Sequence, residues 1–365
     1  MYESSLLPPV RSAEGASRSA AGANDRVRDE LGGQAVASQL GPVGIGVEEE
    51  FASGTFPEDD AMPTPRADMS EEAAEAQPSR LVIDWPVAIW IGGIHLLALA
   101  APFFFTWSGF AICMLLYWVT GGLGVCLGYH RLLTHGSFQT TPLVRFVFAF
   151  LGGVSGEGSA LVWVSNHRKH HAFSDQPGDP HSPRDGGWWA HMLWLFPLHT
   201  ADEVAARANR WAPDLVKDRG IVFLHSTFLL WHFLIGGALL ASGWMLYDRF
   251  TGISWLIWGL AVRMVIVFHV TWLVNSATHM WGYRNYETTD DSKNLWWVGL
   301  LAFGEGWHNN HHAYQRMARH GHRWWEVDTT YWVILCLERV GLSWNVVHDV
   351  GGRRAEASKR PVERT

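Results

Sequence analysis

The chain has 365 residues, a formal net charge of −7, 48% hydrophobic residues and a mean hydropathy of zero, which is an ordinary value for a soluble protein. That average conceals a sharp partition, because residues 1–80 hold 6 Lys/Arg against 15 Asp/Glu and the remainder is slightly basic. Its three cysteines lie in apolar surroundings without CxxC spacing, which argues against a disulfide framework or a thiolate metal site.

The first segment, 1–80, is rich in Ala, Ser, Gly, Pro and acids and shows no helical or strand period. Such a composition cannot bury enough apolar surface to offset the entropy of ordering, so we expect a disordered acidic tail. It lacks the basic start and early apolar stretch of a signal peptide. The basic end, 351–365, is also predicted to be disordered, which leaves 81–350 as the working domain.

Four apolar segments follow, at 81–107, 109–129, 221–247 and 253–275. Each is long enough to cross a bilayer, which takes roughly 20 residues. Arg263 inside the fourth is unusual, because a charge within a membrane is costly and often functional. Two more apolar stretches, 143–164 and 188–199, are predicted to be helices lying on or against the membrane face. The predicted fold is therefore an all-α integral membrane protein with four transmembrane helices in two hairpins and a helical cap.

The charges in the connections predict the orientation. The turn near Ser108 is uncharged, and the turn after the third segment holds only Asp248 and Arg249, whereas 130–220 carries nine Lys/Arg. Basic loops stay on the cytoplasmic side, so we expect that long segment and both termini to be cytoplasmic.

Histidines gather at four places, each next to a predicted span or within the long basic segment. In each HxxHH group the first histidine shares a helical face with the other two. A pair five residues apart converges only where the helix ends or bends. Nine imidazoles exceed the needs of one ion, so the pattern predicts two metal ions, each with four or five nitrogens. Imidazole suits Zn, Cu, Fe and Ni alike, so the ligands alone do not identify the metal. The groups comprise His130, His135, His167, His170, His171, His279, His308, His311 and His312.

The other ten histidines are expected to serve in packing or hydrogen bonding. They are His95, His181, His191, His199, His225, His232, His269, His320, His322 and His348.

The motifs "GYHRLLTHGSF", "HRKHHAFSDQPGDPHSP", "TWLVNSATHMWGYRNY" and "FGEGWHNNHHAYQRMARHGHRWWEVD" resemble those of the membrane fatty acid desaturases, in particular the delta-9 group. The resemblance covers roughly 81–340. It implies four transmembrane helices under a cytosolic cap that holds a di-iron centre. It further implies that dioxygen and two electrons introduce a cis double bond, expected at delta-9, into a saturated acyl chain. The same nine histidines fall on the ligand positions, and Asn275 falls where the family holds a metal-bound water.

The resemblance also defines the expected partners. The acyl-CoA enzymes of animals carry Arg-Asp directly before the second histidine group, where this chain has Ser165 and Asn166. The acyl carrier is therefore left open between CoA and a membrane lipid. Electrons are expected from a separate ferredoxin, flavoprotein or small haem protein, and no nucleic acid is expected as a partner.

Four acids near the histidine groups are candidates to orient the imidazoles: Asp175, Asp179, Glu157 and Glu305.

Two side chains of the second span are predicted to bind substrate. Counting back from His130, the glycines at 128, 124, 122 and 121 leave room for an acyl chain. The first bulky side chains met are Trp118 and Tyr117, with Met114 a turn further, and Trp118 is expected to close the tunnel. Two other functions stay open: hydroxylation of an acyl chain, which shares the removal of a hydrogen atom, and metal transport. Transport would place the ligands near mid-bilayer rather than at span ends.

Overall fold

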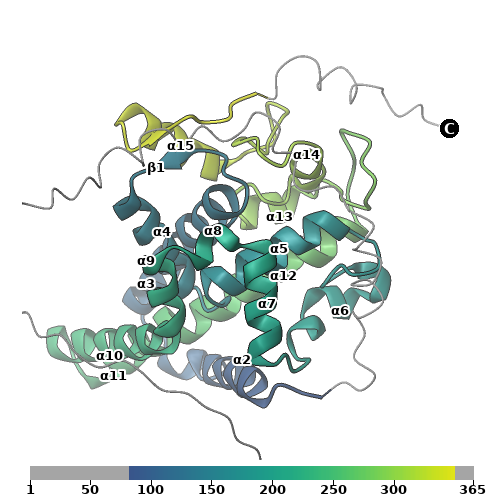
Figure 1. Ribbon diagram of the computed structural model, residues 1–365. Coiled ribbons are helices and arrows are strands. Elements are labelled where there is room, and N and C mark those ends of the chain that lie inside the picture. The colour runs from purple at the N-terminus through teal and green to yellow at the C-terminus, as the bar shows by residue number, and fades with distance from the viewer. Residues whose placement is uncertain (1–81, 350–365) are drawn as a thin grey trace, which may run out of the picture. The chain divides into compact units, whose positions relative to one another are not determined.

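The computed structural model describes residues 82–349, so the acidic segment 1–80 and the basic segment 351–365 lie outside the described residues. The described domain is built almost entirely from helices (Figure 1). Its short antiparallel pair, β1 with β2, joins Gln139 to Trp344 and Thr140 to Ser343.

The elements follow one another through the domain with short connections. In the first half they are α2 (Trp85–Ala98), η1 (Ala101–Phe104), α3 (Trp107–Tyr117), η2 (Trp118–Thr134), β1 (Gln139–Thr140), α4 (Pro142–Val154), α5 (Ala160–Phe173), η3 (Pro183–Asp185), α6 (Gly187–His191) and η4 (Leu193–Leu195). In the second half they are α7 (Ala201–Trp211), α8 (Pro213–Val216), α9 (Arg219–Ser226), α10 (Phe228–Leu246), α11 (Arg249–Leu256), η5 (Ile257–Val262), α12 (Arg263–Met280), α13 (Trp296–Leu301), α14 (His308–Ala313), α15 (Thr329–Arg339) and β2 (Ser343–Trp344).

Three continuous helices in the described part are long and apolar enough to cross a membrane, which fits a membrane protein. They are Trp107–Thr134 with 28 residues, Phe228–Leu246 with 19 and Arg249–Met280 with 32. The first joins α3 to η2 and the third joins α11, η5 and α12. Helices α10 and α11 pack on each other, and Figure 1 shows them at the end of the domain away from α13, α14 and α15.

The first predicted span is shorter than its apolar run. Asp84 accepts a hydrogen bond from the Val87 amide and starts α2 ahead of Pro86, and the helix ends after 14 residues. Pro102 then falls in the 3₁₀-helix η1, because a proline ring disfavours α geometry in the residue before it. Three segments rather than the predicted four therefore meet the length of a span.

Three other expectations also need correction. The stretch 143–164 is two helices, α4 and α5, separated by a turn in which Gly156 and Gly158 have φ of +92° and +102°. The stretch 188–199 contains only the five-residue α6 and the 3₁₀-helix η4. The third span begins at Phe228, because the chain departs from helical geometry at Thr227.

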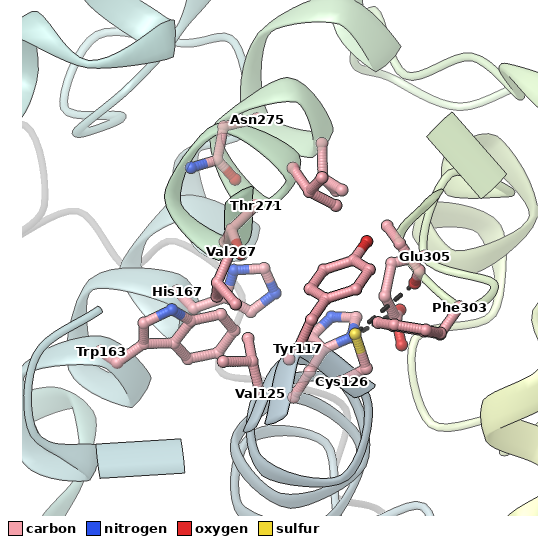
Figure 2. A pocket seen from close by; sticks show the side chains of 15 residues that line it. Tyr117, Val125, Cys126, Trp163, His167, Val267, Thr271, Asn275, Phe303 and Glu305 are labelled. Atoms are coloured by element: carbon pink, nitrogen blue, oxygen red, sulfur yellow. Dashed lines mark hydrogen bonds and ion pairs between the residues drawn. The ribbon is translucent and has the colours of Figure 1, made fainter. Parts of the chain in front are cut away.

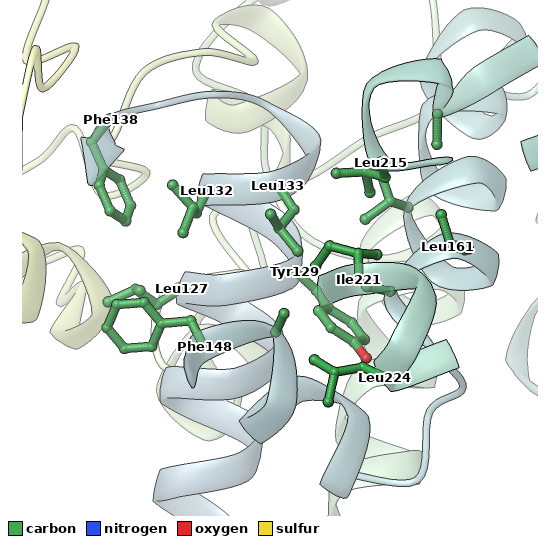
Figure 3. Packing of buried hydrophobic residues seen from close by; sticks show 14 of the residues in the cluster. Leu127, Tyr129, Leu132, Leu133, Phe138, Phe148, Leu161, Leu215, Ile221 and Leu224 are labelled. Atoms are coloured by element: carbon green, nitrogen blue, oxygen red, sulfur yellow. The ribbon is translucent and has the colours of Figure 1, made fainter. Parts of the chain in front are cut away.

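The largest core lies where η2 packs against α4, α5 and α9. Figure 3 shows Leu127, Tyr129 and Leu133 among the buried side chains of this cluster. Glycine allows the two backbones to approach closely, because a Cβ at Gly124 would lie 2.5 Å from backbone atoms of Leu151 and Gly152. This contact fixes the depth of η2, which carries the first two histidines of the predicted site.

Arg263, flagged by its place in an apolar segment, is fully buried. It donates hydrogen bonds to the carbonyls of Val154 at 2.7 Å and Ser155 at 3.2 Å, where α4 ends. A cation is favourable there because the last carbonyls of a helix carry partial negative charge. The residue therefore ties α12 to the turn between α4 and α5.

Replacing Gly124 with Ala should lower the free energy of unfolding by about 1–3 kcal/mol, because the added methyl group is forced into the α4 backbone. Thermal unfolding in detergent measures this change. Gly93→Ala is the matched control, since nothing lies within 4 Å of the new methyl group there. Equal melting temperatures for the two variants would show that the η2–α4 contact is not tight.

Candidate metal centre

The geometry of η2 explains how His130 and His135 meet despite their five-residue spacing. This segment is a π-helix, and at its end the His135 amide donates to the His130 carbonyl at 3.2 Å, an i→i+5 bond. Residues five apart then share a face, and the two ring centroids lie 4.8 Å apart. The convergence that a straight α-helix forbids is thus built into the backbone.

The nine predicted positions come together in two groups. His130, His135, His167, His171 and His311 form one group, and in each group the ligand atoms lie within 4.8 Å of one another. The second group comprises His170, His279, His308 and His312. All but His171 are buried, and α5 and α14 each contribute to both groups. The structure therefore divides the histidines into five and four.

The spacing of the ring nitrogens tests whether a metal fits. In the five-membered group the Nε2 atom of His311 lies 3.1 Å from that of His130 and 3.0 Å from that of His171, which is itself 3.1 Å from that of His167. An imidazole nitrogen carries either one proton or one lone pair, so the central atoms cannot bond well to both neighbours. A shared cation would satisfy all of them.

Two further atoms lead to the same conclusion. The Nε2 atoms of His135 and His170 are buried without a hydrogen-bond partner. Buried polar atoms are seldom left unpaired, because each costs about 1–3 kcal/mol. The donor set therefore fits metal ions at both groups.

Carboxylates hold the outer nitrogens of four of these rings. The Nδ1 atoms of His130 and His170 lie 2.8 Å from Glu305 and 2.9 Å from Asp179, respectively. The Nδ1 atom of His279 lies 2.7 Å from a carboxylate oxygen of Asp175, and that of His312 lies 2.7 Å from one of Asp290. Such pairs turn the inner nitrogen toward a metal and raise its basicity.

Three of the four acids proposed from the sequence are thus found against the site. Glu157 is not, and it packs against other side chains, Thr271 and Trp272. Asp290 escaped sequence reasoning because nothing in "TTDDSK" distinguishes it from Asp291, whose side chain pairs instead with Arg184 at 2.8 Å.

Electrostatics keep the ring nitrogens available. Burial, together with the neighbouring imidazoles, lowers the pKa of His135, His167, His171, His308 and His311 well below the usual value. These rings are therefore neutral at neutral pH, which is the form that binds a metal. Burial alone would raise the pKa of Asp179, but the adjacent His170 holds it below its ordinary range.

Two histidines assigned to packing in fact contact the centre. His320 donates from Nδ1 to the Glu305 carboxylate at 2.8 Å, and its ring lies 4.5 Å from that of His311. His181 stacks on His170 with centroids 4.3 Å apart. Their positions depend on loop geometry, which no local spacing predicts. Arg131, buried between Glu305 and Asp328, fixes the first of these carboxylates.

An apolar cavity adjoins the five-membered group (Figure 2). Its polar lining includes His130, His167, Glu305 and Asn275, so the predicted water-binding asparagine faces the same space. Trp118, expected to close it, and Met114, expected to bind substrate one turn further, are each 41% exposed and are not among the residues that line it. Tyr117 lines it instead, because the π-helix shifts which side chains of this span point inward.

Three features indicate the class of protein: helices long enough to cross a membrane, a buried histidine centre suited to two metal ions, and an adjoining apolar cavity. Together they are typical of a membrane metalloprotein that acts on an apolar ligand. Comparison with known proteins makes the class specific. The fatty acid desaturase family model matches residues 105–335.

Individual relatives agree with that match. An sn-1 stearoyl-lipid 9-desaturase of Anabaena variabilis is 44% identical over 266 residues, which is 72% of this chain and 94% of that protein. A chloroplastic palmitoyl-monogalactosyldiacylglycerol delta-7 desaturase of Arabidopsis thaliana is 43% identical over 72% of this chain and 69% of that protein. An acyl-CoA 5-desaturase of Anemone leveillei is 44% identical over 71% of this chain and 78% of that protein. The chain belongs to the fatty acid desaturase family and is an oxidoreductase, which confirms the resemblance seen in its motifs.

His170→Ala should reduce the bound metal and abolish activity, because it removes one of four nitrogens from its group. Metal content by plasma mass spectrometry and product analysis measure the two effects. His191→Ala is the control, since His191 pairs with His269 at 3.0 Å and belongs to neither group. Similar metal loss in both variants would contradict the separation of ligands from other histidines.

Proposed function

We propose that the chain is an oxygen-dependent acyl desaturase that places a cis double bond at delta-9 of a membrane-lipid acyl chain, using two iron ions and two external electrons. The observation that carries this proposal is the apolar cavity whose wall includes His130 and His167. A hydrocarbon chain can lie there against the five-membered histidine group. Iron and dioxygen supply the oxidising power needed to break an unactivated C–H bond.

The number of converging nitrogens supports the proposed pair of ions. Five nitrogens meet in one group and four in the other, whereas a zinc site in proteins usually has four ligands. Asn275, beside the cavity, is proposed to hold a water on one ion.

The protein's own residues position and shield the reactants. The four carboxylates fix the imidazole orientations, and the apolar side chains of the cavity exclude bulk water from the reacting methylenes. The proposed reaction uses no side-chain nucleophile, so the proposed role of the protein is placement rather than covalent catalysis.

A lipid-linked acyl chain is proposed as the substrate. Asn166 stands where acyl-CoA enzymes of animals carry an acid, and its side-chain oxygen accepts a hydrogen bond from Arg207 at 2.8 Å. Relatives named for acyl-lipid and for acyl-CoA substrates show similar identity, so they do not favour either carrier. The electron donor is proposed to be a separate ferredoxin, flavoprotein or small haem protein.

We also propose that the metal centre and both termini lie on the cytoplasmic side, with α2 entering the membrane as a fourth, shorter span. The nine Lys/Arg between 130 and 220 support this orientation. The turn at Asp248 would then lie on the opposite side.

Chain length is proposed to depend on the cavity end formed by Tyr117, Gly121 and Phe303. The Tyr117 and Phe303 rings lie 4.9 Å apart, and a Cβ at Gly121 would meet both at 3.5–3.6 Å. Gly121→Leu should therefore shift the products from a mixture of saturated chains toward shorter acyl groups. Gly237→Leu, at an exposed site with nothing within 4 Å, is the control. An unchanged length preference in a folded, metal-loaded Gly121 variant would place the end of the cavity elsewhere.

The function is tested by expression in a host that lacks delta-9 desaturation, followed by profiling of fatty acids in separated lipid classes. We expect new cis delta-9 monoenes in membrane lipids, and none with the His170→Ala variant. Hydroxylated chains would identify a hydroxylase instead. Products confined to the acyl-CoA pool would overturn the proposed carrier while leaving the reaction intact.

A further inference from the structure

The turn between α4 and α5 is held in place by hydrogen bonds and by packing against α12, although it carries none of the nine histidines. Arg263 holds the carbonyls of Val154 and Ser155. The Tyr129 hydroxyl donates to the Gly158 carbonyl at 3.1 Å, and the Glu157 amide donates to Ser155 Oγ at 3.2 Å. A Cβ at Gly156 would lie 2.3 Å from Met264 and 2.9 Å from Phe268, so the turn is pressed against α12.

This packing presents one carboxyl group, that of Glu157, to the side chains of Thr271 and Trp272 on α12. Its Oε1 atom is buried without a hydrogen-bond partner. Burial raises the pKa of Glu157 well above the usual value, opposed by the neighbouring side chains of Thr271 and Trp272. Burial therefore favours the neutral carboxylic acid, which carries a proton.

Thr271 connects this acid to the site. It lines the cavity together with His130, His167 and Asn275, and Figure 2 shows Thr271 and Asn275 on the same helix along that space. Asn275 follows Thr271 by four residues and so lies one turn further toward the histidines. A hydroxyl group can accept a proton on one side while donating one on the other.

The proposed reaction needs protons inside this water-excluding cavity. One dioxygen, two electrons from the external reductant, two protons and a –CH2–CH2– unit give –CH=CH– and two waters. Each oxygen atom leaves as water, and the two protons supplement the two hydrogens taken from the acyl chain. If no proton reaches the reduced oxygen inside the cavity, it leaves as the peroxide anion and takes its two protons from solvent as hydrogen peroxide.

We propose that Glu157 and Thr271 form an acid–hydroxyl pair that passes a proton from the Glu157 carboxyl, through the Thr271 hydroxyl, into the cavity during oxygen reduction. Glu157 is then regenerated by a proton from solvent, one for each that it delivers. The role rests on the proposed oxygen-dependent desaturation. It differs from that of the four carboxylates at the histidines, because Glu157 touches none of the nine rings.

The test uses the full-length enzyme loaded with iron and an acyl-lipid substrate. The metal is reduced with dithionite, the excess reductant is removed, and oxygenated buffer starts a single turnover. The readouts are double bonds per reduced centre, hydrogen peroxide, and the solvent deuterium isotope effect. Glu157→Gln keeps the shape of the side chain but removes the transferable proton. Glu338→Gln is the control, because Glu338 pairs with His348 far from the site.

Glu157→Gln should lower the yield of double bonds at least fivefold with a matching rise in peroxide, while iron content and melting temperature stay unchanged. Thr271→Val should do the same and Thr271→Ser should restore the yield, which tests the pair independently if the Glu157 variant does not fold. Wild-type yield and isotope effect in Glu157→Gln or Thr271→Val would overturn the inference and leave desaturation standing. A wild-type enzyme that forms no double bond would contradict the proposed function itself.

Discussion

The arrangement on which the rest of the structure depends is the close approach of nine imidazoles in a space that excludes water. Nitrogens 3.0–3.1 Å apart cannot all be satisfied by protons, whereas a shared cation would satisfy them together. The buried carboxylates of Asp175, Asp179, Asp290 and Glu305 serve this need from the outside. They fix four rings and balance positive charge that burial would otherwise make costly.

The helical scaffold holds that centre beside an apolar cavity. The π-helix η2 brings His130 and His135 to one face, and its glycine contact with α4 sets its depth. Helix α12 carries His279 at its end and the wall of the cavity along its length. One helix therefore carries both a histidine of the centre and part of the cavity wall, which fixes the position of the cavity relative to the histidines.

The sequence predicted the centre better than it predicted the scaffold, for a physical reason. The HxxHH spacing fixes which side chains share a helical face whatever the surroundings, so the ligand groups could be named in advance. The approach of His130 to His135 needed a π-helix, and Asp290 needed a loop to reach His312; both depend on tertiary packing. Trp118 was placed in the cavity by counting along an α-helix, and that count fails in a π-helix. The apolar run at 81–107 indicated a full span, but Pro102 ends its helix early.

The pairing of β1 with β2 has a consequence for how the protein is made. Gln139 lies four residues after His135, and its partner Trp344 is near the end of the described domain. The Val347 amide also donates to the Ser137 carbonyl at 2.9 Å. Because the chain emerges from the ribosome N-terminus first, the membrane helices up to Met280 are complete while the loop after His135 still lacks this support. His308, His311 and His312 are also among the last segments to appear. The histidine centre is therefore complete only late in synthesis, after the helices up to Met280 have been made.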